Sequence, residues 1–481
     1  MRTSARLRSS LLIAALAAAT TTAAACGRGS ATGPSTATPM PTPGPAPAPT
    51  PAPVPPIVDG PTAEESLAWV LDTINGGGKL TTADVESRFA PSFLKVVPAD
   101  KVVTIFGQLA GQLPPIKQLK LDSKPPLELS ALLDTAAGGV RVGLQMTATT
   151  PRQIAGLVFA PATSEAPPRT YGDAVAQLEK AATKTELFVA EIDKGTCKPL
   201  QNHNSTDRLG IGSAFKLWVL LALDDKLAHD KKLTWDTMLA VRDEAKSLPS
   251  GEMQDLPAGT QRSLRDFATN MISISDNTAT DHLIDFVGRE QVEKALTTAK
   301  HGDPKLDIPF LRTREMFALK LAVTPAELDA YRKAPVAAKK KLLESYRQRP
   351  IDVAQAVKDW TAPRDLDLEW FASGPDLCNV MATLGDRANW KPEAEPLSIL
   401  AKNPGAPYDK SKWTYIGFKG GSEPGVMNLT WLGHRVDDRW FVVTATVNDD
   451  QKAIDEALVV NAAAGALAIL GGEAPAAAPA P

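Results

Sequence analysis

The stretch Gly210-Ile-Gly-Ser-Ala-Phe-Lys-Leu-Trp-Val-Leu-Leu-Ala222 decides the fold of most of this chain. Gly210 and Gly212 precede Ser213, and an apolar run follows Lys216. This pattern is typical of a loop that leads into a buried helix. With Ser213 in the first helical turn, Lys216 shares its face, because residues three apart are neighbours on a helix. A helix N-terminus also stabilises negative charge, such as an alkoxide or oxyanion. The alternative interpretation of Ser213 is an ordinary helix-capping serine.

Two further short motifs follow along the chain. The Ser-Asp-Asn at 275–277 lies between helix-like segments at 263–274 and 278–287, and by itself it is typical of a polar turn. The Lys-Gly-Gly at 419–421 follows the alternating run 413–418, which predicts a strand entering a glycine turn. Each motif is weak alone. All three together, in this order and in these contexts, indicate an active site.

The residue types in these motifs fit nucleophilic catalysis. A serine hydroxyl is a poor nucleophile without a base, and Lys216 becomes that base if burial and the charge of Lys419 lower its pKa. Ser275 can pass a proton to the leaving group, and Asn277 can hold Lys216 and a substrate amide. Lys419 supplies positive charge for a substrate carboxylate. We therefore predict Ser213, Lys216, Ser275 and Lys419 as catalytic residues and Asn277 as a substrate-binding residue.

The motif order resembles that of the penicillin-recognising serine hydrolases, S-x-x-K, S-D-N and K-T-G. Residues 170–471 resemble a class A β-lactamase or a penicillin-binding-protein-type serine hydrolase. The resemblance implies an α+β fold, in which an antiparallel sheet with flanking helices carries an inserted all-helical subdomain. It also implies an oxyanion hole made by the backbone N–H groups of Ser213 and Ser422, beside Gly421. The chain resembles the clavulanate-cluster esterase type still more, because an isomerase-like domain comes first, and mycobacterial-type envelope lipoproteins share this arrangement.

Several residues depart from the family pattern. Gly420 stands where the third motif has Thr, whose hydroxyl helps to hold a β-lactam carboxylate, and Glu423 would repel a carboxylate if it pointed inward. The sequence has no E-x-x-L-N loop, whose Glu activates the deacylating water in class A β-lactamases. Glu315 is the nearest candidate by position, but we interpret it as a surface or capping residue. These departures favour an esterase, a peptidase or a slow β-lactamase over an efficient penicillinase.

The spacing of the motifs is also unusual. Ser275 and Lys419 are 144 residues apart (419 − 275), and the excess over the compact pattern is the charged helical stretch 324–360. This stretch either caps the site or is a solvated insertion. Phe418 and Met427 flank the third motif. They either form an apolar wall for an acyl group, as substrate-binding residues, or pack in the core.

The beginning of the chain predicts export. A basic segment and a short apolar core precede Thr-Ala-Ala-Ala-Cys, which resembles a bacterial lipoprotein signal. We predict that 1–26 is a signal peptide with a lipobox, and that lipidated Cys26 anchors the protein to the outer face of the cell membrane. The alternative is a plain signal peptide cleaved near Ala25. Residues 27–59, rich in Pro, Ala and Thr, are predicted to be an extended linker, and 473–481 a disordered tail.

Residues 60–165 predict a smaller domain ahead of the hydrolase domain at 166–472. Helix-like segments come first and strand-like runs follow, which favours a cone-like α+β domain of the isomerase-like kind. A structural or substrate-gating role is our interpretation, and binding of a small apolar molecule is the alternative. The predicted helices are 61–75, 82–93 and 99–110, and the predicted strands are 117–121, 127–133, 140–147 and 154–159.

Composition argues against several other classes of function. The 52 Lys and Arg residues against 55 Asp and Glu give a net charge of −3, which disfavours a nucleic-acid partner. The five His have no metal-ligand spacing and no C-x-x-C is present, so no metal site is predicted. No cofactor is predicted either, because nucleotide-binding motifs are missing. Cys197 and Cys378 form an even pair, which suggests a disulfide in an exported chain, although their spacing leaves the pairing open.

The predicted function is a lipid-anchored serine hydrolase that forms an acyl-enzyme at Ser213. Its predicted substrate is a β-lactam, an ester or a peptidoglycan peptide (muropeptide). The alternative is a non-catalytic lipoprotein that binds cell-wall fragments or β-lactams through the same cleft. The sequence leaves the oligomeric state open.

Overall fold

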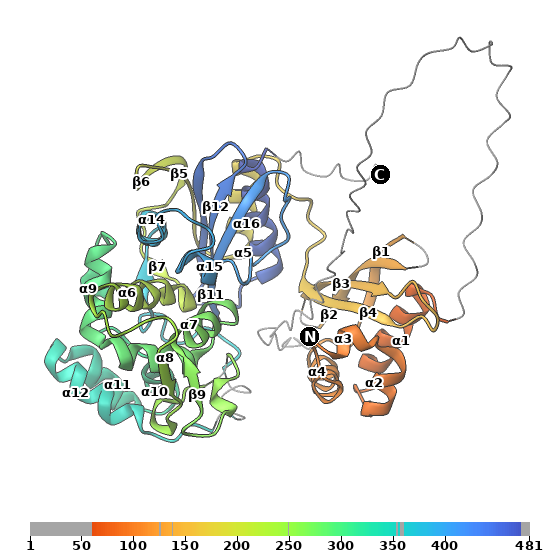
Figure 1. Cartoon of the computed structure of the whole chain (residues 1–481), viewed down its shortest axis with the longest axis horizontal. Helices are drawn as coiled ribbons and strands as arrows, with labels where there is room; N and C mark the ends of the chain where they lie inside the picture. Colours follow the sequence, from red (N-terminus) through yellow and green to blue (C-terminus); the bar gives the residue numbers. More distant parts are fainter. Residues whose placement is uncertain are drawn as a thin grey trace, which may run out of the picture. The chain divides into compact units, whose positions relative to one another are not determined.

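The computed structural model describes residues 60–472 except 125–126, 137, 249, 353–354 and 356–359. The predicted signal peptide with Cys26, the linker at 27–59 and the tail at 473–481 lie outside the described residues. The chain divides into two compact units, with Ala160 the last residue of the first and Pro161–Pro481, together with 137–139, in the second (Figure 1). Within the described residues, no helix combines the length and the apolar character needed to cross a membrane.

The N-terminal unit is a four-stranded antiparallel sheet, in the order β1-β2-β3-β4, with helices packed on it (Figure 1). Alternate residues of β3 are buried, as expected for a sheet with one covered face. Phe89, Phe93 and Phe106 are buried, and the rings of Phe93 and Phe106 both contact that of Phe89 at the centre of the core. The elements are α1 (Ala63–Asn75), α2 (Thr82–Arg88), α3 (Pro91–Leu94), α4 (Ala99–Gln112), β1 (Lys117–Lys124), β2 (Glu128–Thr135), β3 (Gly138–Met146) and β4 (Ile154–Pro161).

The C-terminal unit is built on a five-stranded antiparallel sheet in the order β11-β12-β13-β5-β6. Helices α5 and α16 cover one face and share an apolar core with it, while α14 and α6 belong to the core on the other face (Figure 1). Every residue of β13 is buried, because helices cover the central strands on both faces. The elements are α5 (Tyr171–Ala181), β5 (Lys184–Asp193), β6 (Thr196–His203), α6 (Lys216–His229), α14 (Gly374–Arg387), α15 (Leu397–Leu400), β11 (Trp413–Glu423), β12 (Val426–Arg435), β13 (Trp440–Asn448) and α16 (Glu456–Leu470).

A helical region lies between α6 and α14 in the sequence. Short strand pairs, β8 with β9 and β7 with β10, frame it. The stretch predicted to be a charged helical insertion contains α11 and α12, and α12 contacts α10. The elements are β7 (Leu209–Gly210), β8 (Met238–Ala240), β9 (Gln261–Ser263), α7 (Leu264–Ser273), α8 (Asn277–Val287), α9 (Arg289–Thr298), α10 (Thr313–Leu321), α11 (Pro325–Lys333), α12 (Val336–Arg347) and β10 (Phe371–Ala372), with 3-10 turns η1 (Gly212–Phe215), η2 (Asp243–Ala245), η3 (Met253–Asp255) and η4 (Pro304–Asp307).

Two predicted elements differ from the structure. The single helix predicted at 82–93 is broken, because Ala90 precedes Pro91 and is extended, as residues before proline prefer. The strand predicted to end at Phe418 continues to Glu423, so the Lys-Gly-Gly motif lies inside β11. The turn comes afterwards at Gly425, whose φ is +88°.

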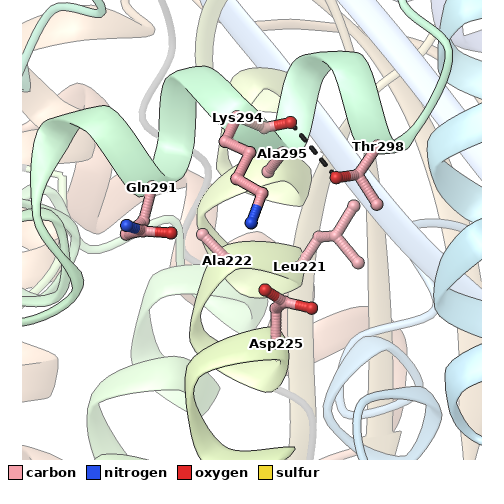
Figure 2. Close-up of a pocket in the computed structure, with 7 residues that line it drawn as sticks. All are labelled: Leu221, Ala222, Asp225, Gln291, Lys294, Ala295 and Thr298. Carbon is pink, nitrogen blue, oxygen red and sulfur yellow. Dashed lines mark hydrogen bonds between the residues drawn. The ribbon is translucent and has the colours of Figure 1, made fainter. Parts of the chain in front are cut away.

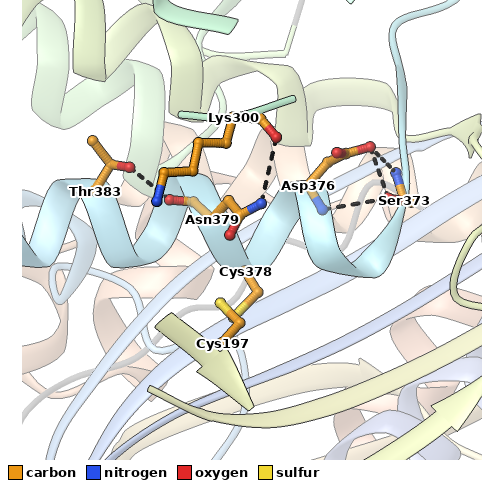
Figure 3. Close-up of a disulfide and its surroundings, with 7 residues drawn as sticks. All are labelled: Cys197, Lys300, Ser373, Asp376, Cys378, Asn379 and Thr383. Carbon is orange, nitrogen blue, oxygen red and sulfur yellow. Dashed lines mark hydrogen bonds between the residues drawn. A yellow bond between two sulfur atoms is a disulfide. The ribbon is translucent and has the colours of Figure 1, made fainter. Parts of the chain in front are cut away.

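The structure joins Cys197 on β6 to Cys378 on α14 in a disulfide, the pairing that the sequence left open (Figure 3). Cys378 is fully buried in the apolar core that α14 shares with the sheet. The bond spans 181 residues of sequence. It therefore removes a large loop-closure entropy from the unfolded chain.

The double variant Cys197→Ala, Cys378→Ala is expected to lose about 2–5 kcal/mol of unfolding free energy, because the unfolded chain regains that freedom. Urea unfolding followed by circular dichroism measures the difference. Reductant should destabilise the wild type and leave the double variant unchanged. Equal unfolding free energies for oxidised wild type and double variant would contradict the expectation.

Candidate active site

The chain is held firmly just before Ser213. Strand β7 pairs with β10, which fixes Gly210 opposite Phe371. Gly212 then takes a φ of +49°, in the left-handed region that favours glycine, and its N–H donates to the Glu369 carboxylate at 3.1 Å. Ser213 follows in η1 and is half-buried. The pairing and this hydrogen bond thus position the predicted nucleophile at the entrance of α6.

Lys216 is the first residue of α6 and is completely buried. Its Nζ donates to Ser275 O at 2.6 Å, Ser275 Oγ at 3.0 Å and Asn277 Oδ1 at 2.7 Å. Burial, and then the positive charge of Lys419, lower the pKa of Lys216 well below its usual value. A lysine with a lowered pKa supplies the neutral amine that a general base requires.

The Ser275 turn is strained and strongly anchored. Ser275 has a φ of +58°, which costs energy for a residue with a side chain. Its carbonyl accepts from Ser250 Oγ at 2.7 Å. The buried Asp276 carboxylate accepts from three backbone N–H groups, those of Glu252, Met253 and Ala279, at 2.7–2.8 Å. These bonds hold the unusual backbone that directs Ser275 Oγ toward the two lysines.

Lys419 completes the cluster from β11. Its Nζ donates to Ser275 Oγ at 3.1 Å and to the carbonyl of Gly420. Burial lowers the pKa of Lys419 to about 7. Ser275 Oγ therefore lies between two amines with lowered pKa values, at 3.0 and 3.1 Å. A hydroxyl in this position can accept a proton from one amine and donate its own to the other.

The backbone of β11 packs directly on the turn that carries Ser213. A Cβ on Gly421 would overlap the amide nitrogen of Ser213, and a Cβ on Gly212 would lie 2.9 Å from the amide nitrogen of Ser422. Only glycine permits this approach. The amide nitrogens of Ser213 and Ser422 thus lie at one backbone contact, and the Ser422 side chain is exposed.

The structure brings together Ser213, Lys216, Ser275, Asn277 and Lys419, the residues named from the three motifs, with the Gly421 and Ser422 backbone beside them. Ser213 Oγ makes no hydrogen bond within the residues that the structure describes, so its placement rests on η1 and the following turn. A second S-x-x-K string, at 92–95, begins on the short helix α3, where Ser92 and Lys95 are exposed.

The apolar wall predicted from Phe418 and Met427 is not what the structure forms. Met427 is buried in the core between the sheet and helices α5 and α16. Phe418 points away from Lys419, because successive strand residues face opposite sides, and its ring lies 5.0 Å from that of Trp431. A Cβ on Gly420 would lie 2.8 Å from Phe418 Cζ. The Phe418 ring thus occupies the space beside Gly420 that a Thr side chain would need.

Glu315 is the capping residue that the sequence indicated, but the expectation that it lies at the surface is wrong. It caps α10 through the N–H of Arg312 at 2.8 Å and is fully buried. Arg289 and Arg312 donate to its Oε1 at 2.6 and 2.8 Å. Arg289 is the first residue of α9 and Arg312 directly precedes α10. Neither belongs to one of the three motifs, so the sequence did not indicate that they contact Glu315. With two guanidinium groups on its carboxylate, Glu315 is not free to activate water.

Figure 2 shows a small pocket between the middle of α6 and α9. None of the residues predicted for the site line it, so we do not assign the chemistry there. Among the residues that the structure describes, no group of three or more His, Cys, Asp or Glu could hold a metal ion. The pocket is lined by Leu221, Ala222, Asp225, Gln291, Lys294, Ala295 and Thr298.

Two family models match parts of the chain. Residues 171–331, which carry the first two motifs, match the model of the beta-lactamase enzyme family. The C-terminal unit has the beta-lactamase-like α+β fold. Residues 58–148 match a separate family, described as the N-terminal part of the ORF 12 gene product. No curated protein matches the chain.

Solved structures similar to the chain are distant from it in sequence. A beta-lactamase from Sphaerobacter thermophilus is 20% identical, covers 63% of this chain and 98% of its own, and has a TM-score of 0.45. A class A beta-lactamase from Bacteroides cellulosilyticus is 18% identical, with coverage of 64% and 100% and a TM-score of 0.39. A PBP-A mutant, solved as an acyl-enzyme with penicillin G, is 14% identical, with coverage of 63% and 99% and a TM-score of 0.36.

Proposed function

We propose that this protein is a serine hydrolase that forms an acyl-enzyme at Ser213. The observation that carries the proposal is the position of Ser275 Oγ between the amines of Lys216 and Lys419, next to the turn of Ser213. Two buried lysines with lowered pKa values around one hydroxyl have little structural value, since burial of charge is costly. Perturbed lysines of this kind are typical of functional sites.

The proposed reaction uses each group of the cluster. Neutral Lys216 takes the proton of Ser213, and the resulting alkoxide attacks the acyl carbon of the substrate. The amides of Ser213 and Ser422 receive the developing oxyanion. The proton then passes through Ser275 to the leaving group, with Lys419 supplying positive charge beside it. Water hydrolyses the ester at Ser213 and restores the hydroxyl.

We propose a β-lactam, an ester or a peptidoglycan peptide as the substrate. Gly420 supplies no hydroxyl in place of the family's Thr, whose hydroxyl holds a β-lactam carboxylate. Glu315 is engaged with two arginines and cannot serve the deacylating water. Both features favour an ester, a peptide or a slowly released β-lactam over rapid penicillin hydrolysis.

We also propose export and lipid anchoring through Cys26, at the outer face of the cell membrane. The basic and apolar segments ahead of Cys26 and the Pro-rich stretch after it support this location. A separate N-terminal domain supports the clavulanate-cluster esterase type among the family's members.

Intact-mass measurement with a chromogenic cephalosporin tests the proposal, with ring opening and side-chain release followed together. Wild type is expected to gain a covalent adduct, and Ser213→Ala to lose adduct and turnover by about 10³-fold or more while staying folded. Ser92→Ala, in the other S-x-x-K, is the matched control and should behave as wild type. An adduct that persists in Ser213→Ala would refute Ser213 as the nucleophile.

A further inference from the structure

A buried charge cluster lies behind the nucleophile, made of Lys320 on α10, Glu369 before β10 and Glu423 at the end of β11. We call it the Lys320 cluster. The three side chains are 0%, 1% and 7% exposed. Lys320 Nζ lies 2.5 Å from Glu423 Oε1 and 3.5 Å from Glu369 Oε1. The ammonium group of Lys320 therefore pairs with two carboxylates, which come from segments 54 residues apart (423 − 369).

Each carboxylate is joined to a different wall of the candidate site. Glu369 Oε2 accepts the N–H of Gly212, the residue before the predicted nucleophile. Glu423 follows Ser422 directly in β11, the strand that also carries Lys419. Lys320 thus connects the turn that carries Ser213 with the end of β11, where the amide of Ser422 faces that turn.

The contact between those two walls lacks side chains that could set its spacing. Gly212 and Gly421 meet there, backbone against backbone. Interlocking side chains normally fix such distances in a core. Here the spacing depends on groups beside the contact, and the Lys320 cluster is attached to both walls.

Lys320 also keeps the two carboxylates together. Glu423 Oε2 is buried without a hydrogen-bond partner among the described residues, and Glu369 Oε1 accepts no hydrogen bond either. Burial and then the charge of Glu369 raise the pKa of Glu423. Burial alone would lower the pKa of Lys320, but the two carboxylates raise it, so its ammonium form is favoured. Without this cation, the carboxylates would repel each other in a low-dielectric interior.

We propose that Lys320 is a positioning residue of the hydrolase site, which holds Glu369 and Glu423 together and so fixes the distance between the Ser213 turn and the end of β11. This inference rests on the proposed function for its effect on rate. Its effect on the backbone does not depend on that function. The residue acts through the amides of Ser213 and Ser422 and touches no reacting atom.

The test compares Lys320→Met with Lys333→Met, the same substitution at an exposed lysine of α11 that pairs with Asp329. Hydrogen exchange is measured by mass spectrometry in the full chain, in peptides covering 209–216 and 418–426. In parallel, the rate of Ser213 acylation and its KM are measured. Lys320→Met is expected to speed exchange in both peptides and to slow acylation by about 10²-fold with little change in KM, since small displacements of catalytic groups have such effects. Lys333→Met should change neither.

Glu423→Leu is a second variant, because Lys320→Met leaves two buried carboxylates uncompensated and could fail to fold. It keeps the pair of Lys320 with Glu369 and removes only the connection to β11. Faster exchange is therefore expected at 418–426 but not at 209–216. Lys320→Arg, which keeps a charged donor for both carboxylates, should recover acylation to within about tenfold of wild type.

Unchanged exchange in both peptides of Lys320→Met, or in 418–426 of Glu423→Leu if the first variant does not fold, would overturn the proposal. So would a fall in melting temperature with no change in acylation below it, which is the result of a purely structural role. If wild type forms no adduct at Ser213, the proposed function fails, and the exchange data alone then decide whether Lys320 positions the two walls.

Discussion

Lys216→Met is expected to slow acylation of Ser213 by about 10³-fold, within the range that general-base groups contribute. Methionine fills a similar volume, so the buried space stays occupied. The Ser275 turn keeps its bond from Ser250, and Asn277 Nδ2 keeps its bond to Leu248 O at 3.1 Å. The fold should therefore persist while the base is lost. Pre-steady-state release of a chromogenic leaving group measures the acylation rate.

Lys226→Met, later on the same helix, is the matched control for this substitution, and we expect it to acylate as wild type does. The pH profile separates the two lysines of the site. Lys419, with a pKa of about 7, carries its charge below that pH and loses it above, so acylation should decline above pH of about 7. Burial and then the charge of Lys419 lower the pKa of Lys216, and its protonation should reduce acylation as the pH falls, a dependence that Lys216→Met would lack. Acylation at the wild-type rate in that variant would exclude Lys216 as the base.

Glu315→Leu is expected to lower the free energy of unfolding by about 3–5 kcal/mol. The substitution leaves the guanidinium groups of Arg289 and Arg312 buried without their main carboxylate partner. Asp285 pairs with Arg312 and limits the loss for that residue. Urea unfolding of the full chain measures the difference.

Glu327→Leu is the control for Glu315→Leu, because Glu327 occupies the same capping position on α11 but at the surface. Its loss of stability should be much smaller. A Glu315→Leu variant as stable as wild type that accumulates acyl-enzyme would show instead that Glu315 activates the deacylating water. This outcome would contradict the role that its two arginine contacts indicate.

The sequence predicted part of the grouping of the candidate residues, because each motif has its own local structure. Ser213 and Lys216 are three residues apart at the start of a helix, so their proximity follows from helix geometry. The meeting of Ser275 with Lys419 does not follow from local geometry, since 144 residues separate them. There the resemblance to a known family supplied the expectation, and the hydrogen bond agrees with it.

What the sequence did not reveal depends on packing between distant segments. Glycine composition at 420–421 predicted a turn, but close approach to η1 keeps these residues in an extended strand. Glu315 looked like a surface residue because one of its arginine partners, Arg289, lies 26 residues away at the start of α9. Glu369 and Lys320 had no signal at all, as single charged residues usually lie at the surface.

The strand order has a consequence for how the protein is made. Strand β5 is the first strand of the five-stranded sheet along the chain and pairs with β13, which begins 247 residues after β5 ends (440 − 193). A chain produced from its N-terminus thus carries Ser213 and Lys216 long before Lys419 exists. Because such non-local pairing forms late, the candidate site assembles only when nearly the whole domain has been synthesised. A chain truncated before β11 would hold Ser213 and Lys216 but would lack Lys419.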